Sequence, residues 1–155
     1  MTKTVSLRVA SADAMEALGG RLARCCSPGV RLYLSGELAA GKTTFARGYL
    51  RALGHNGAVK SPTFTLVETY ELTSRVVHHF DLYRLAAAEL DFIGIEDYFD
   101  ADADCLVEWA ERGAPVLPVP DVTLTLRVVD GGREVQLESH GSRGDEIVLI
   151  CLKQK

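Results

Sequence analysis

Apolar and polar residues alternate with a period of two near both ends of the chain, and this period is typical of half-buried β-strands. Near the N-terminus the alternation covers residues 5–9. Toward the C-terminus it covers residues 122–128 and 135–137, and Asp130-Gly131-Gly132 lies between these two segments. A short glycine-containing turn between alternating segments is typical of an antiparallel hairpin. The pattern therefore predicts an N-terminal strand and an antiparallel hairpin toward the C-terminus.

The middle of the chain contains shorter apolar runs that also predict strands. Residues 30–35 form a run rich in β-formers, which is typical of a buried strand. Residues 66–72 and 76–80 are two further runs, and a short polar turn separates them. Residues 105–107 form the last run, which ends directly before an acidic residue. We therefore expect one buried strand, two strands joined by a turn, and one short strand.

Three other stretches have the apolar spacing of helices. Ser11 is expected to cap the first of them, which runs to about Cys25. Residues 45–53 predict a second, amphipathic helix. In residues 86–99 the spacing is again helical, and we expect two short helices that are broken near Gly94.

Two segments near acidic residues are harder to assign. Residues 100–104 are rich in aspartate and are expected to form an acidic loop. In the C-terminal segment, Ser142-x-x-Asp145 is typical of a helix cap, whereas the apolar residues 147–150 favour a strand. We favour the helix.

The order of these elements predicts an α/β fold. We expect three layers, in which a mostly parallel central sheet carries helices on both faces and an antiparallel hairpin at its C-terminal side. The chain has 155 residues, of which 47% are hydrophobic. This is enough for one sizeable core, and residues 1–155 are expected to form a single domain.

Charge and cysteine content exclude some classes of protein. The formal net charge is −4, which gives no general attraction to nucleic acid. No apolar run has the length of a membrane span, and residues 1–9 lack the apolar core of a signal peptide. The four cysteines have no spacing typical of a metal site, which fits a reducing compartment. We therefore expect a cytoplasmic protein with no membrane partner.

A glycine-rich motif, Gly-x-x-x-x-Gly-Lys-Thr, covers residues 36–43, between the predicted strand 30–35 and the predicted helix 45–53. In this order the motif is a P-loop, whose backbone N–H groups surround phosphates at a helix N-terminus. Lys42 would supply a cation to the β- and γ-phosphates, and Thr43 a hydroxyl ligand to Mg²⁺. The alternative is an ordinary glycine turn before a helix. The strand and helix on either side favour nucleotide binding.

Two carboxylates follow apolar strands, at the position where α/β sheets bind ligands. Glu108 ends the run 105–107 and is interpreted as the acid that holds Mg²⁺, with a solvated surface side chain as the alternative. Asp81 directly follows the run 76–80. This position fits two roles equally, one in hydrolysis and one as the N-cap of a helix that starts at Leu82.

Further polar side chains lie near these positions in the sequence. Ser61 and Thr63 flank a proline after the second helix, where a loop that senses the γ-phosphate would lie, although such a segment is more often only a turn. His78 and His79 are adjacent on a predicted strand and so face opposite sides, which favours core or surface roles over a metal site. The chain has no Asn-Lys-x-Asp guanine-binding element and no arginine-rich kinase lid.

Taken together, five segments occur in an order that resembles the bacterial TsaE family, also called YjeE. They are GELAAGKTT (36–44), KSPTF (60–64), HFDLYRL (79–85), GIEDY (94–98) and VEWAE (107–111). The resemblance implies a P-loop ATPase with ATP and Mg²⁺ as cofactors, required for threonylcarbamoyladenosine modification of tRNA. It implies action with the TsaB–TsaD complex, which the ATPase resets between turnovers, indirect contact with tRNA through that complex, and slow hydrolysis by the chain alone.

The resemblance also assigns roles to particular positions. It implies that Lys42 and Asp81 act in catalysis, and that Thr43 and Glu108 hold the metal. Ser61, Thr63 and Trp109 would respond to the nucleotide. The remaining implied nucleotide-binding positions belong to the loop, the first helix and the hairpin, and are Ser11, Glu37, Leu38, Ala39, Ala40, Gly41, Thr44 and Arg133.

One position departs from the family pattern, and two other functions stay open. The family usually has glycine where this chain has Ala39, and a positive φ there would strain alanine by roughly 1 kcal/mol or more. The first alternative function is a nucleotide-gated regulatory module without significant turnover. The second is a small-molecule phosphotransferase, which the missing lid disfavours.

Overall fold

The computed structural model describes residues 2–85, 89, 94–100, 102–114 and 116–153. The strands in this part of the chain are β1 (Thr4–Val9), β2 (Arg31–Gly36), β3 (Val67–Glu71), β4 (Val76–Asp81), β5 (Asp104–Glu108), β6 (Val122–Val129) and β7 (Gly132–Ser139). The α-helices are α1 (Ala12–Cys25), α2 (Lys42–Ala52) and α4 (Ser142–Lys153), and two short 3₁₀ helices are η1 (Ile95–Tyr98) and η2 (Ala110–Gly113). The predicted strands, the hairpin and the C-terminal helix are thus confirmed.

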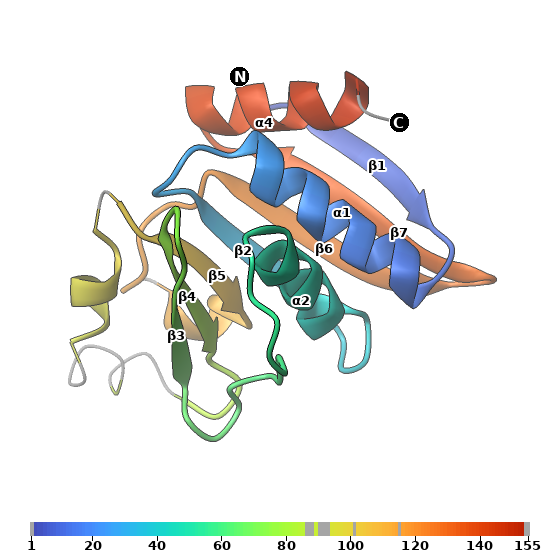
Figure 1. Ribbon diagram of the computed structural model, residues 1–155. Helices are drawn as coiled ribbons and strands as arrows, with labels where there is room; N and C mark the ends of the chain where they lie inside the picture. Colours follow the sequence, from blue (N-terminus) through green and yellow to red (C-terminus); the bar gives the residue numbers. More distant parts are fainter. Residues whose placement is uncertain (1, 86–88, 90–93, 101, 115, 154–155) are drawn as a thin grey trace.

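The described strands form one seven-stranded sheet in the order β1-β7-β6-β2-β5-β4-β3 (Figure 1). The central pairs β6–β2, β2–β5 and β5–β4 are parallel. The outer pairs β1–β7, β7–β6 and β4–β3 are antiparallel. The sheet is therefore mixed, and the expectation of a mostly parallel sheet was wrong. Short turns join β3 to β4 and β6 to β7, and such turns allow only antiparallel pairing, whereas β1 and β7 are far apart in the sequence.

The three described α-helices lie on the same face of the sheet (Figure 1). Successive side chains of a strand point to opposite faces of the sheet. Leu32 and Leu34 therefore belong to the large core under the helices, whereas Tyr33 belongs to a smaller core on the other face. There the described cover includes Ile95 of η1 and Ala110 of η2. Within the described residues, the expectation of helices on both faces is therefore met on this face only by the short 3₁₀ helices η1 and η2.

Close packing between α1 and α2 fixes the position of the helix that follows the glycine-rich loop. A Cβ on Gly19 would lie 2.2 Å from the Phe45 carbonyl oxygen, and one on Gly48 would lie 2.0 Å from the Glu16 carbonyl oxygen. Larger side chains at either position would force the helices apart. Ser11 caps α1 as expected, since its side chain accepts a hydrogen bond from the Ala14 amide.

The sequence predicted that Asp104 belongs to an acidic loop, and this was wrong. Asp104 begins β5, and its side chain is fully buried. One carboxylate oxygen accepts hydrogen bonds from the Gly29 and Val30 amides. The other accepts from Tyr49 on α2 and from Arg75. Burial raises the pKa of Tyr49, and the neighbouring Asp104 carboxylate raises it further. These partners replace the water that a buried carboxylate loses, and they tie β5 to β2 and α2.

The segment before β5 differs in part from its prediction. The first of the two short helices expected in residues 86–99 lies mostly outside the described residues. The second is the single 3₁₀ turn η1, which follows Gly94 with a φ of 71°. A residue in the left-handed region cannot continue a right-handed helix, so η1 begins only after Gly94.

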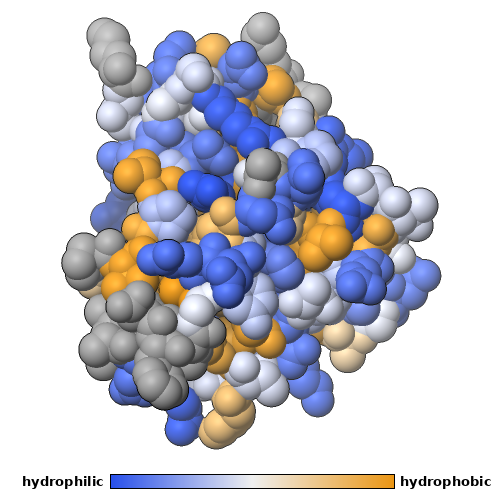
Figure 2. Space-filling view, turned by 90° about the vertical axis from the view of Figure 1, so that its left-hand side faces the viewer, coloured by the Kyte–Doolittle hydropathy of each residue, from blue (hydrophilic) through white to orange (hydrophobic). Residues whose placement is uncertain are grey.

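Strand β3 lies at one edge of the sheet and exposes mainly polar side chains, among them Glu68, Thr69 and Glu71. Figure 2 shows the molecule from the left of Figure 1, and hydrophobic residues on this side are interspersed with hydrophilic ones. Charged side chains on an edge strand oppose pairing with another chain. Among the described residues no helix has the length and apolar character that crossing a membrane requires.

Candidate functional site

The glycine-rich loop, residues 36–43, connects the C-terminal end of β2 to the first turn of α2. Gly36, Ala39 and Gly41 all have positive φ angles, of 149°, 66° and 114°. At Gly36 a Cβ would lie 2.5 Å from the Leu126 carbonyl oxygen of β6, so only glycine fits. Ala39 is in the left-handed region, and the loop therefore imposes on this alanine the strain that the sequence raised as a possibility.

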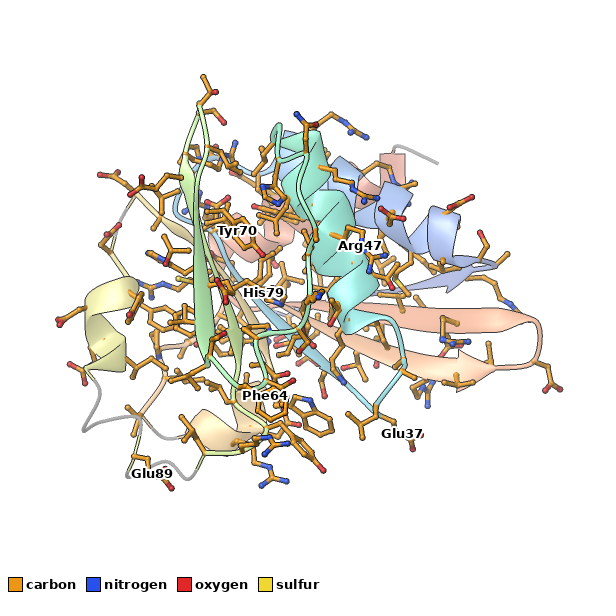
Figure 3. The ribbon with its side chains drawn as sticks, turned by 60° about the horizontal axis from the view of Figure 1, so that its bottom comes forward. Glu37, Arg47, Phe64, Tyr70, His79 and Glu89 are labelled. Carbon is orange, nitrogen blue, oxygen red and sulfur yellow. The ribbon has the colours of Figure 1, made fainter. Side chains whose placement is uncertain are left out.

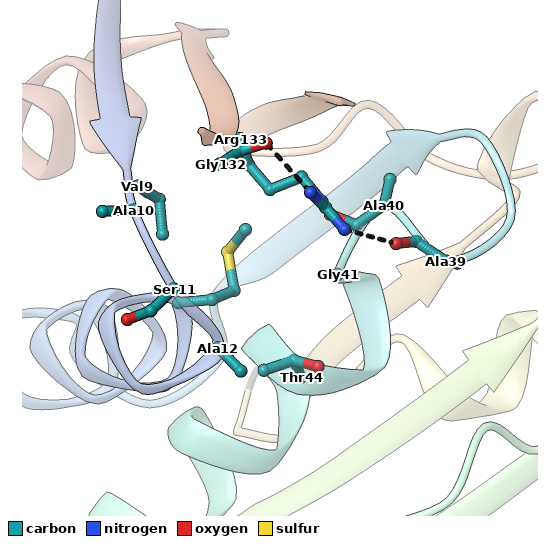
Figure 4. Close-up of a pocket in the computed structure, with 11 residues that line it drawn as sticks. Val9, Ala10, Ser11, Ala12, Ala39, Ala40, Gly41, Thr44, Gly132 and Arg133 are labelled. Carbon is teal, nitrogen blue, oxygen red and sulfur yellow. Dashed lines mark hydrogen bonds between the residues drawn. The ribbon is translucent and has the colours of Figure 1, made fainter. Parts of the chain in front are cut away.

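Arg133 of β7 braces the same loop. Its Nε donates to the Ala40 carbonyl oxygen at 3.1 Å, and its Nη2 donates to the Ala39 carbonyl oxygen at 3.2 Å (Figure 4). The guanidinium therefore holds two consecutive loop carbonyls. The hairpin is in this way connected directly to the strained part of the loop.

A pocket of about 140 Å³ opens between the loop, the end of β1, the start of α1 and the hairpin turn (Figure 4). Its lining is mainly small or apolar and consists of Val9, Ala10, Ser11, Ala12, Met15, Ala39, Ala40, Gly41, Thr44, Gly132 and Arg133. Ser11 and Arg133, which are far apart in the sequence, thus line one cavity.

A second pocket, of about 440 Å³, lies on the other side of the loop. It is lined by Leu38, Ala39, Gly41, Lys42, Thr43, Thr44, Ser61, Thr63, Asp81, Glu108 and Trp109. The two pockets share Ala39, Gly41 and Thr44, so they adjoin along the loop. Among the predicted site residues only Glu37 lines neither pocket. It lies at the outer end of the loop (Figure 3).

A lysine that binds phosphate is expected to face solvent when no phosphate is bound. Lys42 instead is only 5% exposed. Its ammonium group donates hydrogen bonds to the Gly36 and Glu37 carbonyl oxygens of the loop. It also lies 4.3 Å from the centre of the Trp109 ring, within cation–π distance. Burial lowers the pKa of Lys42, and the nearby carboxylates of Glu108 and Asp81 oppose that shift.

Glu108 lies at the C-terminal end of β5, buried beside Thr43 and His79. The Thr43 hydroxyl is 3.2 Å from Glu108 Oε2 and 3.4 Å from Oε1. His79 Nε2 is 2.6 Å from the same Oε2. The alternative of a solvated surface glutamate is therefore wrong.

Asp81 lies next to Glu108, because the two residues are direct partners in the parallel β4–β5 register. Its Oδ2 accepts hydrogen bonds from the hydroxyls of Ser61 and Thr63. Its Oδ1 accepts from the Tyr83 amide at 2.9 Å. Asp81 thus stabilises a turn rather than capping an α-helix at Leu82, and its other oxygen faces the 61–63 segment.

Trp109 follows Glu108 with a left-handed φ of 59°, which turns its ring back over Lys42. The ring of Tyr83 lies 4.9 Å away, centre to centre. Leu38 at the loop tip and Phe64 after the 61–63 segment are both largely exposed. Of these side chains, Trp109 and Leu38 line the second pocket, whereas Phe64 lines a separate pocket.

Comparison with known proteins identifies the family. Residues 9–135 match the model of the family TsaE, described as threonylcarbamoyl adenosine biosynthesis protein TsaE. The chain belongs to the TsaE family. It is therefore related to proteins involved in making threonylcarbamoyladenosine in tRNA. The matched range includes both pockets and every predicted site residue.

Individual TsaE relatives agree with this assignment. The tRNA threonylcarbamoyladenosine biosynthesis protein TsaE of Haemophilus influenzae is 47% identical over 77% of this chain and 76% of its own length. The protein of the same name from Bacillus subtilis is 34% identical over 96% of this chain and 92% of its own length. The crystal structure of Bacillus subtilis YdiB superposes with a TM-score of 0.85 at 28% identity, covering 99% of this chain and 97% of that one.

Sequence reasoning missed one residue of the site in this TsaE family chain. His79 was expected to have a core or surface role, yet it contacts Glu108 directly. The two-residue period of a strand could have revealed it, since Val77, His79 and Asp81 share one face of β4. A site role for Asp81 therefore implies that His79, two positions earlier on the same face of β4, also points toward the site.

Proposed function

We propose that this protein is a P-loop ATPase of the tRNA threonylcarbamoyladenosine machinery, which binds ATP with Mg²⁺ and acts with the TsaB–TsaD complex. One observation carries the proposal. The loop that precedes α2 brings Lys42 and Thr43 into the same pocket as Asp81 and Glu108, the neighbouring carboxylates of two parallel strands. A phosphate chain with its metal ion needs a cation, a hydroxyl and a carboxylate together.

The two adjoining pockets fit the two ends of a nucleotide. The smaller pocket, which is lined mainly by small residues and lies next to Ser11 and Arg133, would take the base, and the larger one the phosphates. The amides of the loop and the N-terminus of α2 favour anions. Lys42 would exchange its carbonyl partners for the phosphate oxygens.

The donors in the second pocket fit Mg²⁺. Adjacent ligands of an octahedral ion with bonds of 2.0–2.1 Å lie roughly 2.9 Å apart. The separation of 3.2 Å between Thr43 Oγ1 and Glu108 Oε2 is close to that value. Mg²⁺ usually keeps several of its waters in proteins, so one hydroxyl and one carboxylate are enough protein ligands for it. When bound, the ion would offset the negative charge of the phosphates.

Asp81 is the proposed residue that orients the attacking water. Its Oδ2 is already shared by the Ser61 and Thr63 hydroxyls, so its capacity to hold a water depends on the 61–63 segment. This dependence supports slow hydrolysis by the chain alone and faster hydrolysis when a partner moves the segment. The TsaB–TsaD complex is the proposed partner, and contact with tRNA is indirect, through that complex.

Binding of nucleotides tests the proposal, with the fluorescence of the single tryptophan, Trp109, as the signal. ADP is expected to bind more tightly than GDP, and Mg²⁺ is expected to strengthen binding of ATP. Lys42→Ala removes the cation next to the phosphates and should lower ATP affinity or hydrolysis severely. Tighter binding of GDP, or ATPase activity unchanged in Lys42→Ala, would contradict the proposal.

A further inference from the structure

His79 is fully buried on β4, in the interior of the molecule (Figure 3). Its Nε2 lies 2.6 Å from Glu108 Oε2 on the neighbouring strand β5. Within the described residues its other ring nitrogen, Nδ1, has no hydrogen-bond partner. The hydrogen bond to Glu108 is therefore the polar contact that accounts for a buried imidazole at this position.

The chemistry of the pair defines which atom donates. An ionised carboxylate can only accept hydrogen bonds, so Nε2 carries the proton and donates it to Oε2. With the donor on Nε2, the partnerless Nδ1 can carry the lone pair, so this tautomer leaves no buried N–H without an acceptor. His79 is thus the hydrogen-bond donor and Glu108 the acceptor, and this bond orients the carboxylate of Glu108.

The carboxylate of Glu108 has few other restraints. In the described part of the chain Thr43 is its other side-chain hydrogen-bond partner, at 3.2 Å from Oε2 and 3.4 Å from Oε1, and these contacts are longer than that of His79. Glu108 is also only 2% exposed, so little solvent is available to restrain its carboxylate in place of a lost partner. Without His79 the carboxylate could turn away from Thr43 by rotation of its own side chain.

We propose that His79 is a positioning residue, which acts through Glu108 and holds this carboxylate in the orientation that Mg²⁺ requires. The inference rests on the proposed function, because it needs Glu108 to be a ligand of the ion. Hydrogen-bonded neighbours of a metal ligand fix its orientation, and their loss typically costs 10–100-fold in metal affinity or activity. His79 contributes nothing else to the phosphate pocket, whose lining does not include it.

Three substitutions at His79 test whether its side chain acts as a hydrogen-bond donor to Glu108 or only fills space in the core. The side-chain amide of glutamine can occupy the place of Nε2, whereas that of asparagine corresponds to Nδ1. Phenylalanine retains the ring and removes both nitrogens. ADP affinity is measured for each variant by Trp109 fluorescence, once with saturating Mg²⁺ and once with EDTA.

The Mg²⁺-dependent gain in ADP affinity should fall about 10–100-fold in His79→Phe and His79→Asn. It should be largely retained in His79→Gln, and ADP affinity in EDTA should stay the same in all three variants. His78→Phe is the matched control, because His78 is the adjacent residue of β4 and contacts Thr69 and Tyr98 instead. That control should bind ADP like the unchanged protein under both conditions.

Several results would overturn the inference. Full Mg²⁺ dependence in His79→Phe would show that the hydrogen bond does not matter. Equal Mg²⁺ dependence in the Gln and Asn variants would contradict the role of Nε2, and this comparison remains valid if the Phe variant does not fold. A fall in ADP affinity in EDTA would indicate a structural role only. If the unchanged protein itself shows no Mg²⁺-dependent gain, the proposed function fails instead.

Discussion

Individual residues of the glycine-rich loop have conformations that their side chains disfavour. Ala39 has a φ of 66°, and Arg133 holds its carbonyl oxygen in place from the hairpin. The neighbouring Ala40 is buried and has no positive φ. Two alanines next to each other should therefore respond in opposite ways to replacement by glycine.

Ala39→Gly should stabilise the protein by about 1 kcal/mol, because glycine adopts the left-handed region without strain. Ala40→Gly, the control, should destabilise it by about 1 kcal/mol, since glycine has more conformational freedom to lose on folding. Thermal unfolding measures both, and each change corresponds to about 2–4 °C for a protein of this size. A lower melting temperature for Ala39→Gly would mean that the loop is not strained at this residue.

Asp81 and Glu108 are adjacent but should have separable roles. Asp81→Asn keeps the oxygen that accepts from the Tyr83 amide and loses the carboxylate charge. It should bind ATP almost normally and hydrolyse it about 100-fold more slowly or worse. Glu108→Gln should instead lose the Mg²⁺-dependent part of nucleotide affinity.

Melting temperature, nucleotide affinity and hydrolysis are measured on the same two variants. Asp81→Ala serves as the control for the structural role, because it also loses the contact with Tyr83 and about 1 kcal/mol of stability. An Asp81→Asn protein that hydrolyses ATP at the normal rate would refute the role of Asp81 in hydrolysis.

At the scale of elements, the position of α2 depends on its contact with α1. Both helices bring a glycine against the backbone of the other, Gly19 against Phe45 and Gly48 against Glu16. The first residue of α2 is Lys42, so displacement of this helix would also displace the loop and its lysine.

Gly48→Ala should destabilise the protein by about 1–3 kcal/mol, because the new methyl group would overlap the Glu16 carbonyl oxygen. Gly20→Ala is the matched control on α1. Its Cβ would lie 3.2 Å from the mobile end of Arg24, and alanine favours the helix by up to about 1 kcal/mol. Denaturant unfolding compares the two variants. Equal stability of both would contradict the close packing of α1 and α2.

The elements themselves could be predicted largely from the sequence, because they depend on local patterns. The alternation around Val5 and Val135 and the cap at Ser11 are local features. The order of the strands and the choice of face for the helices depend on pairings between distant residues. For that reason the mixed sheet, and the placement of all described α-helices on one face, were not predicted.

The same distinction applies to the site. Lys42, Thr43, Asp81 and Glu108 could be proposed from the sequence because each lies at a characteristic point of a motif or strand, and the structure brings them into one pocket. The burial of Lys42 could not be predicted, since its carbonyl and Trp109 partners exist only once the loop is folded. The pairing of His79 with Glu108 likewise requires the β4–β5 register.

For the whole molecule, the fold brings the ends of β2, β4 and β5 to one edge of the sheet, where the loop, Asp81 and Glu108 meet. Ligands of α/β sheets bind at this carboxyl edge. The exposed Leu38 lines the same pocket, and the exposed Phe64 directly follows the 61–63 segment. A partner that reaches this edge could therefore act on the 61–63 segment, which holds Asp81.

The most direct test of the account is the amount of threonylcarbamoyladenosine formed on unmodified tRNA over many turnovers. The reaction contains the TsaB–TsaD complex, the threonylcarbamoyl donor and ATP, with this protein omitted, added, or added as Asp81→Asn. We expect modification to continue beyond one equivalent of TsaB–TsaD only with the unchanged protein. Repeated turnover without the protein, or equally with Asp81→Asn, would contradict a role in which ATP hydrolysis by this chain resets the complex.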